Sequence, residues 1–160
     1  MNVLSVNFQE LYERHLCRHS QLGINVIHLA AVVGTYLALY GLLYGLVPSA
    51  WALVGVAVPY LAVLAVNVPG RVFLVNVLFI ALLFAAFFAL PRLPFWAYLV
   101  AIVVCHRLQS WSHKVYSKER DMTAFNKKYQ KGFVLFVLLS VYELPILLNY
   151  LFFGRRDWCA

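Results

Sequence analysis

Charged residues, and acidic residues above all, are scarce in this chain of 160 residues. It contains six Asp and Glu against thirteen Lys and Arg, and charged residues make up 12% of the sequence, whereas 64% is hydrophobic. A soluble domain of this size could not hide so much apolar surface from water. The few carboxylates also exclude the dense acidic clusters that hold calcium or magnesium. We therefore expect an integral membrane protein.

Cysteine is scarce too, and the first 25 residues lack the pattern of a secretory signal peptide. Cys17, Cys105 and Cys159 are odd in number and far apart, which argues against a disulfide framework. The first 25 residues carry Glu and Arg side chains and lack a continuous apolar core, so we expect no cleavable signal peptide. Membrane insertion then depends on the first apolar segment.

Long apolar runs make up most of the sequence. Five runs approach the length of about 20 residues that a helix needs to cross a bilayer. They cover residues 26–47, 51–68, 72–90, 94–113 and 132–153, with Pro-containing turns between the first four. The last run contains Pro145 and either crosses as a kinked span or turns back there as a hairpin. The predicted fold is an all-α integral membrane protein with a single domain, residues 1–160, built as a four- or five-helix transmembrane bundle.

Two further segments, residues 5–22 and 117–131, are amphipathic. The first predicts an N-terminal helix on the membrane surface that ends before Gly23. Six of the thirteen basic residues lie in residues 114–131, where anionic lipid explains them better than nucleic acid does. The distribution of Lys and Arg places the N-terminus and this basic loop in the cytoplasm, which fits a bacterial inner membrane or the endoplasmic reticulum.

All five histidines fall into two clusters, which the charge pattern places at the same membrane face. His15 and His19 lie about 6 Å apart along a helix axis, whereas His106 and His113 lie about 10.5 Å apart and cannot easily share one ion. Neutral imidazoles with open coordination positions suit iron, zinc or copper. The alternative is that these histidines are solvated or only donate hydrogen bonds to other helices.

Polar residues accompany the second histidine cluster. Gln109 lies on the same helical stripe as His106 and His113, and Glu143 is the one acid in the last apolar run. A buried carboxylate needs a partner, so pairing of Glu143 with Arg107 is favoured over a role as ligand or base.

Two stretches of the chain resemble a known family. The first runs from Tyr12 to His28, with Asn25 and a histidine nine residues before the last one; the second is Gln109-Ser110-Trp111-Ser112-His113-Lys114. They are similar to the small multi-span membrane proteins that include the iron-dependent 2-hydroxy fatty acid dioxygenase of fatty acid α-oxidation. The chain differs from that family in having Ser112 where a glycine is usual, as a distant relative would.

The resemblance implies an Fe(II) site built from His19, His28 and His113, with His15 next in line and His106 as a neighbour. We accordingly expect an Fe(II)-dependent lipid dioxygenase, with zinc or copper as alternative metals. The predicted catalytic residues are Glu143 and Gln109, and the residues predicted to bind the substrate carboxylate are Lys114 and Arg107. Its partners would be the membrane and a lipid or fatty acid substrate, without nucleic acid, and a homo-oligomer is left open.

Two other classes of function are left open. A non-catalytic membrane protein could bind lipid headgroups or a partner through its aromatic and basic rim. A small proton- or ion-conducting protein would need a polar path along His106, Gln109 and Glu143.

Overall fold

The structure, a computed structural model, describes residues 6–116, 127–128 and 132–154, and these residues contain helices and no strand. The helices are α1 (Phe8–Arg18), α2 (Leu22–Leu46), α3 (Ala50–Asn67), α4 (Gly70–Ala89), α5 (Phe95–Tyr116) and α7 (Phe133–Phe152). The all-α prediction is confirmed. Of the predicted interfacial segment 117–131, all but 127–128 lies outside the described residues.

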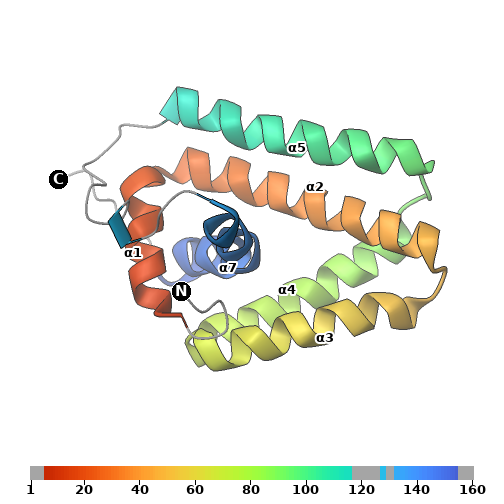
Figure 1. Ribbon diagram of the computed structural model, residues 1–160, viewed down its shortest axis with the longest axis horizontal. Helices are drawn as coiled ribbons and strands as arrows, with labels where there is room; N and C mark the ends of the chain where they lie inside the picture. The colour runs from red at the N-terminus through yellow and green to blue at the C-terminus, as the bar shows by residue number, and fades with distance from the viewer. Residues whose placement is uncertain (1–5, 117–126, 129–131, 155–160) are drawn as a thin grey trace.

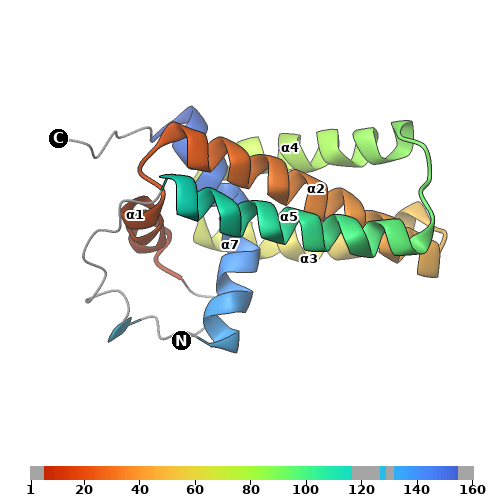
Figure 2. The ribbon, with the colours of Figure 1, turned by 90° about the horizontal axis from the view of Figure 1, so that it is seen from above.

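Helices α2 to α5 run lengthwise through the molecule, whereas α7 crosses them (Figure 1). Figure 1 shows α7 end on and Figure 2 shows it lengthwise, passing across the direction of α2 and α5. The short helix α1 lies at the end of the bundle where α2 begins and α5 ends. Both segments that carry the histidines therefore reach the same end of the bundle.

The predicted turns between the apolar runs are present, but two details differ from expectation. Ser49 ends the first turn as the N-cap of α3, where its side chain accepts a hydrogen bond from the Trp51 amide at 3.2 Å. Gly23, expected to break the chain, lies inside α2, which begins at Leu22. The last apolar run is one helix that continues through Pro145, so the hairpin alternative is wrong. Packed neighbours make such a proline tolerable in an apolar helix.

The amphipathic helix α1 is present as predicted, but its apolar face packs against protein. Phe8, Leu11, Tyr12 and Leu16 are all buried, in a cluster that also contains residues of α3, α4 and α7. The Tyr12 hydroxyl donates a hydrogen bond of 2.6 Å to the Gly154 carbonyl, just after α7. These contacts fix α1 across the end of the bundle.

Four helices are long and apolar enough to cross a membrane: α2, α3, α4 and α7. Helix α5 is not among them, because its second half carries polar and charged side chains. Large apolar side chains also remain exposed on these helices, among them Trp51 and Val66, each 81% exposed. A lipid environment accounts for both observations, which indicate a membrane protein.

Helices α2 and α5 pack closely through glycines on α2. A Cβ atom added at Gly23 would lie 2.7 Å from the Tyr116 ring, and one added at Gly34 would lie 2.6 Å from the Cys105 sulfur. A third such contact joins Gly41 to the ring of Tyr98. The intervals between the three glycines along α2, 11 and 7 residues, equal the intervals between their contacts in the reverse direction along α5. The two helices are therefore antiparallel in one fixed register. Small residues at a helix interface allow this close approach.

Candidate metal centre

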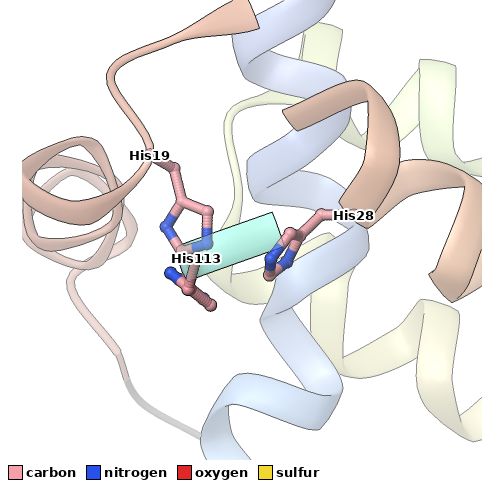
Figure 3. A group of neighbouring side chains, drawn as sticks. All are labelled: His19, His28 and His113. Atoms are coloured by element: carbon pink, nitrogen blue, oxygen red, sulfur yellow. The ribbon is translucent and has the colours of Figure 1, made fainter. Parts of the chain in front are cut away.

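Three histidines from three separate segments meet at the end of the bundle beside α1. His19 follows α1 as its C-cap residue, His28 lies in α2 and His113 lies near the end of α5. One ligand atom from each lies within 4.8 Å of the other two. Figure 3 shows the three rings facing one another across a common space. The structure therefore brings together the three residues that the resemblance implied.

The other ring nitrogens of two of these histidines are hydrogen-bonded to fixed acceptors. His28 Nδ1 lies 3.0 Å from Glu143 Oε1, and His19 Nδ1 lies 3.2 Å from the His15 carbonyl. Carbonyl and carboxylate oxygens accept hydrogen bonds, so each Nδ1 donates and the lone pair remains on Nε2. Metal-ligating histidines show this arrangement, in which a carboxylate or carbonyl orients the ring.

The two Nε2 atoms are buried, and neither has a hydrogen-bond partner among the described residues. A buried polar nitrogen without a partner is costly in free energy, which a metal ion at this position would relieve. Bonds of about 2.1 Å to one ion require separations of about 3.0 to 3.4 Å between the nitrogens, so a small closure of the three rings is enough. The residues thus fit a metal ion.

His15 lies beside the triad rather than within it. Its ring stacks on that of His19, with centroids 3.9 Å apart and planes 5° apart. His15 Nε2 donates to Asn25 Oδ1 at 3.0 Å, and the Asn25 amide donates to the carbonyls of His19 and Gln21 at 2.6 and 2.8 Å. Asn25 therefore holds the turn between α1 and α2 in the shape that presents His19.

Burial keeps both of these histidines uncharged. It lowers the pKa of His15 to about 3, and burial together with the neighbouring histidines lowers the pKa of His19 well below its usual value. A neutral imidazole is the form that binds a metal ion.

Glu143 and Gln109 belong to the support of the triad. The Gln109 amide donates to Glu143 Oε1 at 3.0 Å, the same oxygen that accepts from His28. This carboxylate thus joins α2, α5 and α7. Pairing of Glu143 was the favoured expectation, but its partners in the described part of the chain are His28 and Gln109, and Arg107 is not one of them.

The triad opens into a cavity of about 250 Å³. His106 lines this cavity seven residues from His113 and stands outside the triad. Among the described residues, the cations that line it are Arg14 and Arg18, one helical turn apart on α1. Lys114 and Arg107, the cations predicted to bind substrate, are exposed and do not line it. The sequence contained a signal for the two arginines, since each directly precedes a histidine of the His15 and His19 pair.

The fold and this site together define a helical membrane protein with a three-histidine candidate metal centre. No family model, curated protein or solved structure matches the chain. Membership of the dioxygenase family therefore stays an expectation from the sequence, and the geometry of the site carries the functional argument.

Proposed function

We propose that this protein is a metal-dependent membrane oxygenase that uses Fe(II) and acts on a 2-hydroxy fatty acid or a related lipid acid. The observation that carries the proposal is the pair of buried Nε2 atoms on His19 and His28, which lie next to His113 and have no hydrogen-bond partner in the part of the chain that the structure describes. Three imidazoles leave coordination positions open for a substrate and for dioxygen. Iron, when bound there, would supply the activation of dioxygen, for which zinc is not suited.

The residues around the triad suit a substrate that carries a carboxylate. Arg14 and Arg18 bring positive charge to the cavity beside the histidines. A guanidinium binds a carboxylate through two parallel hydrogen bonds, which fixes its orientation as well as its position. These two side chains would hold the acid group at the triad, while Glu143 and Gln109 keep the His28 ring in place.

The overall reaction balances with dioxygen as the only oxidant. A 2-hydroxy acid and one molecule of dioxygen would give the acid shorter by one carbon, carbon dioxide and water. The bond between the carboxyl carbon and the hydroxyl-bearing carbon breaks, and that second carbon is oxidised to the new carboxyl group. The site must exclude other water and orient the acid, which a cavity among apolar helices favours.

Metal analysis and turnover test the proposal together. The full chain, purified in detergent without oxygen and supplied with Fe(II), should hold one ion per chain and consume oxygen with 2-hydroxypalmitate. His19→Ala, His28→Ala and His113→Ala should each lose the ion, whereas His106→Ala should retain it. A wild-type protein without bound transition metal would overturn the proposal. A protein that binds metal but consumes no oxygen would refute the oxygenase and leave only the metal site.

A further inference from the structure

Two more cavities continue from the triad cavity into the bundle. The larger one, of about 540 Å³, lies among α2, α5 and α7 and shares His106, Gln109 and Glu143 with the triad cavity. The other, of about 230 Å³, shares Tyr36 and Leu39 with the larger one and extends to α3. Because neighbouring cavities share their walls, they form one tract that starts at the metal centre.

One face of α2 forms a wall along the whole tract. Its lining residues recur every three or four positions, which places them on a single stripe: Val32, Thr35, Tyr36, Leu39, Tyr40 and Leu43. His28 lies one turn before Val32 on the same stripe. From His28 to Leu43 the helix rises about 22 Å. Each leaflet accounts for about half of the 30 Å hydrocarbon core of a bilayer, so the tract is long enough for one long acyl chain.

The chemistry of the lining changes from one end of the tract to the other. At the triad the walls carry arginine, histidine, glutamate and glutamine side chains, whereas the far cavity is lined by apolar residues such as Val56, Ala57 and Ile80, with three tyrosines. The larger cavity, of about 540 Å³, lies between the other two and falls within the range of about 300–1,000 Å³ that is typical of small-molecule sites. A ligand that fits this pattern has an acidic head and a long apolar tail.

We propose that the tract holds the acyl chain of the substrate, with its tail between α2, α3 and α7, and that Ser140 keeps the passage open. This inference rests on the proposed function for its choice of head group. Ser140 lines all three cavities, and its hydroxyl donates to the Phe136 carbonyl at 2.9 Å within α7. A small side chain whose polar group is bonded within its own helix leaves room for a hydrocarbon chain. Ser140 is therefore the specificity-determining residue for chain length.

Photo-crosslinking tests the position of the tail. The probe is palmitate with a diazirine at its ω end, bound to the metal-free full chain in detergent, and labelled peptides are identified by mass spectrometry. In the wild type the label should fall around Leu39, Leu43 and Val56. Ser140→Phe should reduce labelling there about tenfold, because a bulky side chain overfills the passage. Leu39→Trp fills the tract from the opposite wall and should do the same if Ser140→Phe does not fold.

The matched control is Ala85→Phe, which adds the same bulk on an exposed face of α4 that lines none of the three cavities. It should leave the labelling pattern unchanged. Label spread over outward-facing residues such as Val66 and Leu82, equally in the wild type and in Ser140→Phe, would overturn the inference. Because the probe lacks a 2-hydroxyl group and no metal is present, this result does not depend on oxygenase activity. A protein that is labelled along the tract but consumes no oxygen would refute the proposed reaction and retain the acyl site.

Discussion

The carboxylate of Glu143 provides the sharpest test of how the metal centre is built. Its Oε1 atom lies 3.0 Å from His28 Nδ1, so the N–H group donates to a carboxylate oxygen. Hydrogen bonds of this kind orient the ring and raise the basicity of the ligating nitrogen, and their loss commonly lowers metal affinity by about 10- to 100-fold. Glu143→Gln keeps the shape and removes the charge, so we expect a loss near tenfold, about 1.4 kcal/mol. Glu143→Leu also removes the acceptor, so its loss should approach 100-fold.

The assay is competition for Zn²⁺ against a chromophoric chelator, with Co²⁺ absorption as a second readout that reports the ligand field. Glu10→Gln is the matched control, because the Glu10 side chain is 24% exposed and the Glu143 side chain is 26% exposed. Both carboxylates also pair with a basic side chain, Glu10 with Lys128 and Glu143 with His28. Glu10 pairs with Lys128, away from the triad, so its replacement should leave metal affinity unchanged. Wild-type affinity and an unaltered Co²⁺ spectrum in Glu143→Gln would refute the argument that this carboxylate orients His28.

Three further changes test the surroundings of the site. Gly34→Leu should push α5 away and weaken metal binding by about 1–3 kcal/mol in chelator competition, whereas Gly55→Leu, whose added side chain meets nothing within 4 Å, should not. The pKa of His15 falls from 6.5 when the chain is unfolded to about 3 when it is folded, so its stabilising contribution is full above pH 6.5 and is lost as the pH falls toward 3. Between pH 7 and pH 5 the metal-free wild type should lose about 2 kcal/mol more stability than His15→Gln does, measured by thermal unfolding with a calibrated denaturant series. Tyr12→Phe removes the hydrogen bond to Gly154 and should cost about 1 kcal/mol in the same assay; an unchanged midpoint would show that this bond does not hold α1 in place.

Periodicity and composition were enough to predict most of the helices. The five apolar runs identified α2, α3, α4, α5 and α7, and prolines marked the turns between the first four of them. Of these five helices, all but α5 are long and apolar enough to cross a membrane. The spacing of Phe8, Leu11 and Leu16 identified α1 as amphipathic, because burial on one side of a helix imposes that spacing regardless of what covers it. The same independence explains why the sequence could not show that protein, and not the membrane surface, covers α1.

Tertiary arrangement decided the features that the sequence left open. Local helix propensity alone predicts that Gly23 interrupts the helix. In the structure Gly23 lies inside α2, at the point where α2 contacts Tyr116 of α5. Pro145 allows either a kink or a turn, and the packed surroundings of α7 decide for a continuous helix. The amphipathic pattern of α1 alone would place Arg14 on the solvated side of the helix. It lines the cavity because α1 lies beside the triad. These outcomes depend on contacts between segments that lie far apart in the sequence. The spacing of residues within one segment does not specify such contacts.

The register of α2 against α5 explains why His113, and not His106, joins the other two histidines of the triad. In the register that the glycine contacts fix, His113 lies level with Val26, close to the start of α2, whereas His106 lies level with Val33. That is a step of about 10.5 Å along the axis, too far for shared ligation at metal–nitrogen distances of about 2 Å. Helical spacing predicted that one ion could not take both residues, and the glycine interface determines which one it takes. A slide of α5 by one turn would bring Gln109 to the level of the triad in place of His113, so the packing of these two helices and the ability to bind a metal ion depend on the same contacts.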